Sequence, residues 1–245
     1  MTLGTVIVTG GSRGIGAATC RILADRGYAV AVNYARDSAA AEQVVAAIHG
    51  QGGRAISVAG DVADPRQVGA MFEAAEQALG PITALVNNAG IIGAAARIDM
   101  QEPADLERLF AVNVLGTMYC AREAVRRMST GHGGSGGGIV NLSSVAARLG
   151  GLSGLSPYAA TKGAIETFTK GLATEVAREG IRVNAVAPGM TATDMASDAM
   201  RDAARAVTPL GRIGEAEEIA EAVVWLLSPA ASYITGTVIT AAGGR

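Results

Sequence analysis

The sequence predicts a doubly wound α/β fold, in which helices cover both faces of one parallel sheet. Seven short runs rich in Val and Ile are separated by longer segments of helical periodicity. Such nearly uninterrupted apolar runs are typical of parallel strands that are buried on both faces. Hydrophobic residues make up 49% of the 245 residues and charged residues only 17%. This composition supplies a large core and excludes wholesale disorder.

Strands and helices are expected to alternate along the whole chain. The expected strands are Thr5–Thr9, Val30–Val32, Ala55–Ala59, Ala84–Val86, Ile139–Leu142, Ile181–Val186 and Thr237–Thr240. The expected helices are Ile15–Arg26, Ser38–His49, Pro65–Leu79, Pro103–Met128, Tyr158–Glu179 and Glu215–Leu227. Right-handed crossovers then place the helices on both sides of the sheet. No linker or repeat interrupts this pattern, so residues 1–245 are expected to form one domain, and the low-complexity segment 131–138 is interpreted as a mobile surface turn.

Charge and cysteine content exclude several classes of protein. The net charge is -2 and the pI is about 5.8, whereas a nucleic-acid-binding protein needs a basic stripe. No apolar run reaches the roughly 18 residues of a membrane span, and no signal-peptide layout opens the chain. Cys20 and Cys120 lie far apart, and His49 and His132 are the only histidines. We therefore expect no disulfide framework, no metal site and a cytoplasmic location.

A glycine-rich turn follows the first expected strand. Gly10, Gly14 and Gly16 stand between a buried strand and an amphipathic helix. Glycines at such a junction allow a left-handed turn and let backbone amides approach a pyrophosphate at the helix N-terminus. Their spacing is G-x-x-x-G-x-G, which differs from the usual dinucleotide pattern G-x-G-x-x-G. The position favours nucleotide binding over a plain tight turn.

The end of the second strand bears on the choice between NAD and NADP. An acid there selects NAD by bonding the ribose hydroxyls, whereas an arginine accepts a 2′-phosphate. The strand ends in Asn33-Tyr34-Ala35-Arg36, and the first acid is Asp37. Arg36, helped by Arg13 in the glycine turn, therefore predicts NADP. The alternative is that Arg36 is an ordinary surface charge.

Polar residues also follow the third and fourth strands. Asp61-Val62 and Asn87-Asn88-Ala89-Gly90 fall at the carboxyl edge of the sheet, where doubly wound folds bind their ligands. The two asparagines could line a cofactor or bond backbone across strands, and the sequence leaves both readings open.

Tyr158 and Lys162 are four residues apart near the start of a helix, so both side chains face the same way. Only Lys162 and Lys170 are lysines among 20 basic residues. A free tyrosine has a pKa of about 10, and a neighbouring ammonium favours the phenolate. With Ser144 just after the fifth strand, the pattern predicts a proton-transfer site at the same sheet edge.

These pieces together resemble the short-chain dehydrogenase/reductase family, which implies a single-domain Rossmann fold with a seven-stranded parallel sheet. The resemblance extends from residue 5 to residue 244. It includes the glycine turn, Asp61-Val62, the Asn87–Gly90 segment, Asn113, Asn141-Leu142-Ser143-Ser144, Tyr158-Ala159-Ala160-Thr161-Lys162, the segment from Pro188 to Met195, and Ile234-Thr235-Gly236. Members often end in Asp-Gly-Gly, where this chain has Ala242 before Gly243-Gly244.

The resemblance implies a catalytic tetrad. Tyr158 would be the proton donor in reduction and the base in oxidation, while Lys162 would lower its pKa and hold the nicotinamide ribose. Ser144 would bind the substrate oxygen, with Ser143 as the second candidate, and Asn113 would hold a water that relays protons. The implied cofactor-binding residues are Gly10, Ser12, Arg13, Gly14, Ile15, Gly16, Tyr34, Arg36, Asp61, Val62, Asn88, Ala89, Gly90, Tyr158, Lys162, Pro188, Gly189, Thr191 and Thr193.

The resemblance also implies an NADP-dependent oxidoreductase acting on a carbonyl/alcohol pair, with NAD as the lesser alternative and a substrate lid at residues 190–214. The sequence is most similar to 3-oxoacyl-carrier-protein reductases and glucose-type sugar dehydrogenases. Arg126 and Arg127 could receive an acidic carrier protein, but Glu179 stands where such reductases can carry a basic residue. A non-catalytic nucleotide-binding regulator is a further alternative, although it would be expected to lack Tyr158 or Lys162. A homotetramer is expected from apolar positions on the two longest helices, among them Leu109, Val112, Val125, Ile165, Phe168 and Leu172.

Overall fold

The structure is a computed structural model that describes residues 3–193 and 198–245. In this part of the chain, all strands join one seven-stranded parallel sheet in the order β3-β2-β1-β4-β5-β6-β7. The strands are β1 Thr5–Val8, β2 Ala29–Tyr34, β3 Arg54–Ala59, β4 Ile82–Asn87, β5 Gly137–Leu142, β6 Ile181–Pro188 and β7 Val238–Ala241. The strand order reverses between β1 and β4, which is the place where such sheets bind ligands. The predicted fold class is confirmed.

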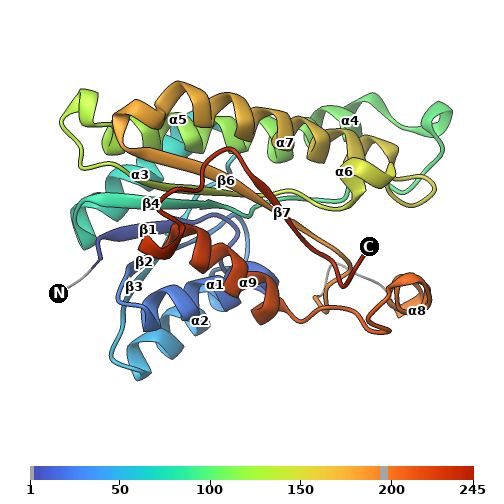
Figure 1. The fold of residues 1–245 in the computed structure, drawn as a ribbon, viewed down its shortest axis with the longest axis horizontal. Coiled ribbons are helices and arrows are strands. Elements are labelled where there is room, and N and C mark those ends of the chain that lie inside the picture. The colour runs from blue at the N-terminus through green and yellow to red at the C-terminus, as the bar shows by residue number, and fades with distance from the viewer. Residues whose placement is uncertain (1–2, 194–197) are drawn as a thin grey trace.

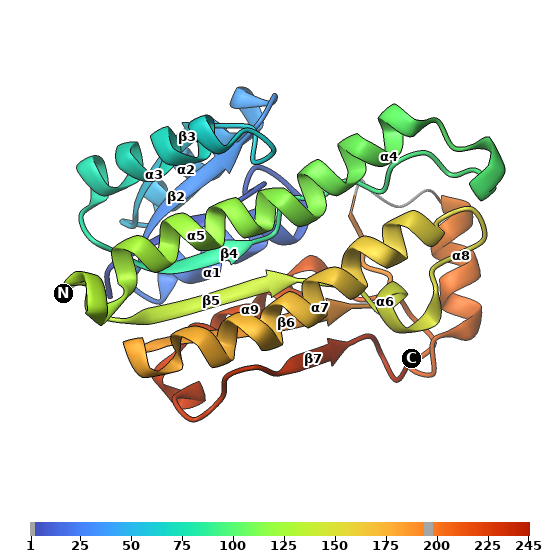
Figure 2. The ribbon, with the colours of Figure 1, turned by 90° about the horizontal axis from the view of Figure 1, so that it is seen from above.

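Helices cover both faces of this sheet (Figure 1). One face carries α1 Gly14–Asp25, α2 Ser38–Gly50 and α9 Ala216–Leu227. The other carries α3 Pro65–Leu79, α4 Pro103–Phe110, α5 Gly116–Met128, α6 Ala146–Leu149 and α7 Ser156–Val176. Helix α8, Asp198–Val207, covers neither face and lies beyond the carboxyl ends of the strands (Figure 2). No helix within residues 3–193 and 198–245 is long and apolar enough to cross a membrane.

The core consists of two main apolar layers, one on each side of the sheet. Leu23, Ile48 and Leu226 belong to the layer under α1, α2 and α9, whereas Phe72 and Met128 belong to the layer under α3, α5 and α7. Full burial of a side chain such as Phe72 contributes roughly 1.5–3 kcal/mol. The two layers hold the sheet rigid, and the ligand-binding loops project from its carboxyl edge.

The helix expected over Pro103–Met128 is not continuous. A π-helical turn at Ala111–Leu115 separates α4 from α5. Asn113 in this turn accepts a hydrogen bond from the Ile91 amide (2.9 Å) and donates to the Ile91 carbonyl (2.9 Å) and to Thr161 Oγ1 (3.1 Å). These contacts fix the turn against the β4 loop and α7. Turns of this type are frequent at functional sites.

The glycine-rich segment 131–138 is only partly a surface turn. A short 3₁₀ helix at Thr130–His132 opens it, and β5 already begins at Gly137. A Cβ on Gly136 would lie 2.5 Å from the Gly180 carbonyl oxygen, and one on Gly137 would lie 2.1 Å from that of Thr83. Its second half is therefore packed against neighbouring backbone. This corrects the interpretation of the whole segment as a surface turn, because glycine is required there for close approach.

Candidate active site

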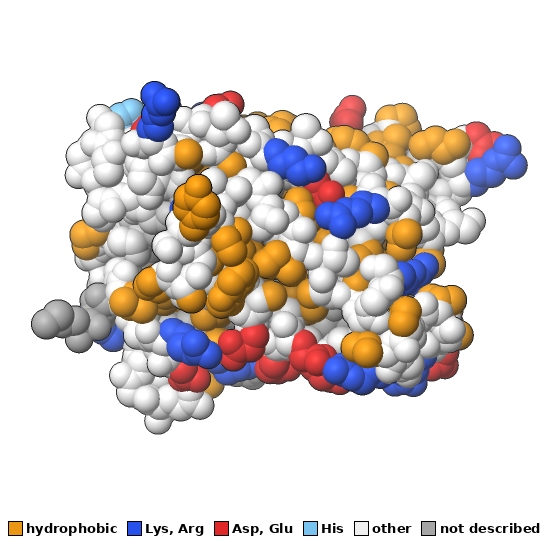
Figure 3. Space-filling model, viewed as in Figure 1, with side chains coloured by type: hydrophobic (Ala, Val, Ile, Leu, Met, Phe, Trp, Pro, Cys, Tyr) orange, Lys and Arg blue, Asp and Glu red, His pale blue; other side chains and the backbone are white. Residues whose placement is uncertain are grey.

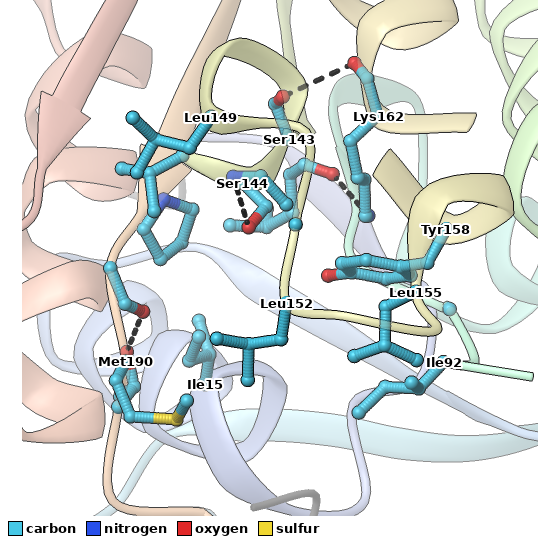
Figure 4. A pocket seen from close by; sticks show the side chains of 18 of the residues that line it. Ile15, Ile92, Ser143, Ser144, Leu149, Leu152, Leu155, Tyr158, Lys162 and Met190 are labelled. Atoms are coloured by element: carbon cyan, nitrogen blue, oxygen red, sulfur yellow. Dashed lines mark hydrogen bonds between the residues drawn. The ribbon is translucent and has the colours of Figure 1, made fainter. Parts of the chain in front are cut away.

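A pocket opens at the carboxyl edge of the sheet (Figure 4). Ser144 follows β5, Tyr158 and Lys162 come from the first turns of α7, and Pro188 ends β6. Because parallel strands end at one edge, these distant segments converge there. The sequence-predicted residues that line the pocket are Ile15, Asn88, Gly90, Ser144, Tyr158, Lys162, Pro188, Gly189, Thr191 and Thr193.

Lys162 is buried beside Tyr158. Its Nζ donates a hydrogen bond to the Leu142 carbonyl oxygen (2.7 Å) and lies 5.7 Å from the centre of the Tyr158 ring. Burial lowers the pKa of Lys162 to about 8, because the charged ammonium is removed from water. A buried lysine of this kind titrates close to physiological pH, which no arginine could do.

Tyr158 is partly buried beside Lys162. Burial raises the pKa of its phenol, and the hydrogen bond with Ser144 acts in the opposite direction with a smaller effect. The expected net lowering of the Tyr158 pKa by Lys162 is therefore wrong for this structure. The physical reason is that the loss of hydration raises the pKa of the Tyr158 phenol more than the hydrogen bond with Ser144 lowers it. Tyr158 is accordingly protonated at neutral pH and is a proton donor.

The two consecutive serines have different surroundings. Ser143 is buried, and its hydroxyl donates to the Lys162 carbonyl (3.3 Å) and to Glu166 Oε1 (3.2 Å). Ser144 Oγ accepts from the Ala146 amide (3.2 Å) and is hydrogen-bonded to Tyr158. Ser144 therefore points toward Tyr158, whereas Ser143 points into α7 (Figure 4). This geometry favours Ser144 as the residue that meets a substrate oxygen.

Asn113 lies behind the pocket and does not line it. The protein contacts already described use both atoms of its side-chain amide. A Cβ on Gly90 would lie 3.4 Å from Asn113 Oδ1 and 3.7 Å from Lys162 Nζ, so Gly90 separates the two. A water-relay role for Asn113 stays a prediction, and its visible role is to hold the Ile91 backbone and α7 together.

Asn87, the last residue of β4, and Asn88, the next residue, both bind protein groups. Asn87 donates to Asn141 Oδ1 across the sheet (2.9 Å). Asn88 donates to the carbonyl oxygens of Thr9 (2.9 Å) and Gly10 (3.0 Å), and it also lines the pocket. The structural reading of this pair is confirmed, and Asn88 ties the end of β4 to the glycine turn.

The glycine turn leaves the start of α1 open. Gly10 (φ +61°) and Gly14 (φ +53°) adopt left-handed conformations, and a Cβ on Gly16 would lie 2.3 Å from the Gly10 carbonyl oxygen. No side chain of the described residues caps α1 at Arg13. The first amides of a helix need partners, and an anion is a suitable one. The turn therefore fits the pyrophosphate of a dinucleotide.

The glycine turn lies beside the end of β2, where the amides of Gly10 and Gly11 donate to Asn33 (3.2 and 2.8 Å). Tyr34 is the last residue of β2, and Arg36 is exposed. Asp37 is the N-cap of α2 and accepts from the Ala40 amide (2.9 Å). The acid nearest to the end of β2 thus caps a helix.

Asp61 at the end of β3 forms an ion pair that the sequence analysis missed. Its carboxylate accepts from Arg108 (2.8 Å) on α4 and from the Ala63 amide (3.0 Å). Val62 is buried and packs closely against Gly116, because a Cβ added to Gly116 would lie 2.7 Å from Val62 Cγ2. Contact of this pair with a cofactor therefore stays a prediction.

Several pocket residues were also missed. Ile92, Leu149, Leu152 and Leu155 add apolar side chains to its lining, and Arg245 also lines the pocket. Met190, the first residue of the expected lid, lines it as well. Of the expected lid, residues 194–197 lie outside the described residues. At its base, Ala192 donates to Gly214 (2.8 Å) and Gly214 to Met190 (3.0 Å).

The comparisons with known proteins agree with this geometry. Residues 10–245 match the family model described as enoyl-(acyl carrier protein) reductase. An uncharacterized oxidoreductase of Escherichia coli is 49% identical over 98% of both chains. L-Rhamnose 1-dehydrogenase (NAD(P)(+)) of Sphingomonas is 39% identical over 98% of this chain and 95% of the relative. A 3-oxoacyl-[acyl-carrier-protein] reductase of Synechocystis is 38% identical over 100% of this chain and 97% of the relative.

A crystal structure of a short-chain dehydrogenase from Burkholderia cenocepacia in complex with NADP is 38% identical and superposes with a TM-score of 0.91. The match covers 98% of this chain and 96% of that one. The chain belongs to the short-chain dehydrogenase/reductase family. As a short-chain dehydrogenase/reductase, it is an oxidoreductase that acts on alcohol or carbonyl groups. The family binds NAD(P), and the residues of the glycine turn fit that group. The alternative of a non-catalytic regulator is set aside.

Proposed function

We propose that this short-chain dehydrogenase/reductase reduces an apolar ketone or aldehyde with NADPH. The observation that carries the proposal is the convergence of Ser144, Tyr158 and Lys162 in one pocket whose other described lining residues are mostly apolar. When bound, the reduced nicotinamide supplies the hydride that the carbonyl carbon accepts. The protein holds the carbonyl oxygen and provides the proton.

The proposed roles follow from the hydrogen bonds at the site. Ser144 donates to the substrate oxygen, and Tyr158 donates its phenolic proton to the same oxygen as the hydride arrives at carbon. The Lys162 ammonium stabilises the phenolate that remains. Because burial raises the pKa of Tyr158, the proton-donor form predominates at neutral pH. The protonated form is the one that reduces a carbonyl and the phenolate is the one that oxidises an alcohol, so the rate of alcohol oxidation should increase as the pH rises.

The proposed cofactor is NADP rather than NAD. Its support is the absence of a free acid at the described end of β2: Asp37 caps α2, and the exposed Arg36 faces no described acidic partner at hydrogen-bond distance. Glycines 10, 14 and 16, with Ser12, Arg13 and Ile15, would hold the phosphates. The nicotinamide would be bordered by Pro188, Gly189, Thr191 and Thr193. The adenosine and ribose side would be bordered by Asp61, Val62, Ala89 and Gly90.

The pocket favours an apolar substrate over a sugar. A sugar needs several hydrogen-bonding partners, whereas Ile92, Leu149, Leu152 and Leu155 offer only apolar side chains to the pocket. This supports a simple ketone or an acyl-type substrate, of which the Synechocystis relative's name gives one example. A carrier protein has weaker support, because Arg126 and Arg127 both pair with Glu123 and Glu179 accepts from Ser129.

A panel of carbonyl substrates tests this function. Cyclohexanone derivatives, 3-oxoacyl thioesters and aldoses are supplied with NADPH or NADH, and the decrease in cofactor absorbance is followed. We expect turnover of apolar ketones with NADPH and little turnover of aldoses. No turnover of any carbonyl, or the fastest turnover with aldoses, would overturn the proposal.

We further propose a cytoplasmic homotetramer. Cys20 and Cys120 are buried and unpaired, which suits a reducing compartment.

Two separate apolar surfaces are exposed. Trp225 on α9 and Tyr233, between α9 and β7 in the sequence, are exposed, and Figure 3 shows hydrophobic side chains gathered over β7 and α9. Phe110 and Leu115 are exposed at the α4–α5 junction. Two different self-complementary surfaces on one chain generate a tetramer with dihedral symmetry.

A further inference from the structure

Part of the pocket wall is assigned neither to the cofactor nor to proton transfer. It consists of Ile92, Leu149, Leu152, Leu155 and Met190, together with Arg245. With the cofactor bound, this wall is what a substrate meets beyond the carbonyl group.

Backbone geometry explains how Arg245 reaches the pocket. After β7 the chain turns through Gly243 (φ +63°) and Gly244 (φ +96°). A Cβ on Gly243 would lie 2.7 Å from Thr208 Cγ2. The Leu210 amide donates to the Gly243 carbonyl (3.1 Å). The chain thus packs against the segment after α8, and its end lies beyond the carboxyl ends of the strands, on the side of α8 (Figures 1 and 2).

Arg245 is the cation that this part of the pocket offers to a ligand. The described lining residues include one other cation, Lys162, whose ammonium is buried against Leu142 and Tyr158. No aspartate or glutamate belongs to the described lining. A guanidinium binds a carboxylate through two parallel hydrogen bonds, which gives geometric as well as electrostatic selection.

We propose that Arg245 is a specificity-determining residue that selects substrates with a carboxylate. Such a substrate has an apolar body, with its ketone at Ser144 and Tyr158 and its carboxylate at Arg245. The apolar body contacts the leucine wall, and the anion remains near water at the pocket mouth. This inference rests on the proposed carbonyl reduction and narrows its substrate class.

The expected size of the effect is moderate. A hydrogen bond to a charged group changes affinity by roughly ten- to a hundred-fold. Arg245 is exposed, and solvent and salt weaken exposed ion pairs. We therefore expect an effect of about five- to twenty-fold at low ionic strength, decreasing as salt is added.

A matched pair of substrates tests the inference. 4-Oxocyclohexanecarboxylate and its methyl ester share the ring and the ketone, and only the acid is charged. We expect the ratio of kcat/KM for acid over ester to fall about five- to twenty-fold in Arg245→Gln. Arg178→Gln is the control, because it removes an exposed charge next to Gly180, at the opposite edge of the sheet, and should leave this ratio unchanged.

Two additional measurements separate the possible outcomes. Titration of the NADP-loaded protein with cyclohexanecarboxylate should show binding that weakens in Arg245→Gln, without any turnover. Gly243→Ala should lower the acid/ester ratio too, because the added Cβ would collide with Thr208 and displace Arg245. If both substrates are reduced and the ratio is the same in wild type and Arg245→Gln, the inference is wrong and the proposed function stands. If no ketone is reduced, both are wrong.

Discussion

Lys162 Nζ donates a hydrogen bond to the carbonyl oxygen of Leu142, the last residue of β5, at a distance of 2.7 Å. This contact joins α7 to the strand that precedes Ser144, so it fixes the spacing between the serine and Tyr158. It also places an ammonium group where water is excluded, which lowers its pKa to about 8. The geometry of the proposed reaction is therefore obtained at a cost in stability.

Replacement of Lys162 by methionine should reveal this cost as a pH-dependent difference in stability. The pKa of Lys162 is lowered on folding, so between about pH 8 and its ordinary value of 10.5 the unfolded chain binds more protons. The stability of the wild type should consequently rise with pH in this interval relative to Lys162→Met. Thermal melts of both proteins between pH 7 and 9.5 check this. A constant difference in Tm would contradict the buried, easily deprotonated lysine.

Arg36→Ala should weaken NADPH binding about ten-fold and change NADH binding little. A hydrogen bond to a charged group is worth roughly ten- to a hundred-fold in affinity. Arg36 is exposed and Arg13 can share the phosphate, so the lower end of that range is expected. Fluorescence titrations with both cofactors measure the change, with Arg178→Ala as the control. Equal losses for NADPH and NADH would show that Arg36 is only a surface charge.

Light scattering should show a tetramer at micromolar concentration, and single charged substitutions should divide it. Trp225→Glu places a carboxylate on the surface over α9 and β7, and Leu115→Glu places one at the α4–α5 junction. Each variant should yield a dimer, because one of the two interfaces remains. A monomeric wild type would refute the proposed assembly, as would tetramers in both variants.

The apolar residues first offered as evidence for a tetramer mostly belong to the core. Leu109, Val112, Ile165 and Leu172 are buried within one chain, and Val125 and Phe168 pack against the core layer under α3, α5 and α7. Helical periodicity identifies an apolar face, but not whether a sheet or a second subunit covers it. The surfaces now proposed are instead defined by exposure.

Local patterns predicted the doubly wound fold class, the glycine turn and the Tyr158–Lys162 pair, because each depends on neighbours in sequence. The four-residue spacing alone places Tyr158 and Lys162 on one side of α7. The π-helical turn was not predictable in this way. It depends on Asn113 binding the Ile91 backbone, a partner 22 residues away.

Contacts between remote segments account for the other omissions. Arg108 meets Asp61 across 47 residues, and Arg245 reaches the pocket only because residues 208–210 pack against Gly243 and Gly244. The direction of the Tyr158 pKa also depends on burial, which no motif records. The motif placed Lys162 correctly beside Tyr158 but did not show that loss of hydration dominates.

The central claim is that Tyr158 transfers the proton during NADPH-dependent carbonyl reduction, and Tyr158→Phe tests it most directly. The ring is kept and only the transferable proton is lost, so NADPH should bind within a few-fold of wild type. A positioned acid contributes roughly a hundred- to ten-thousand-fold to the rate. On the best ketone of the panel, we predict that Tyr158→Phe retains less than about a hundredth of the wild-type kcat. A variant that binds NADPH normally and keeps more than about a tenth of that rate would contradict the account.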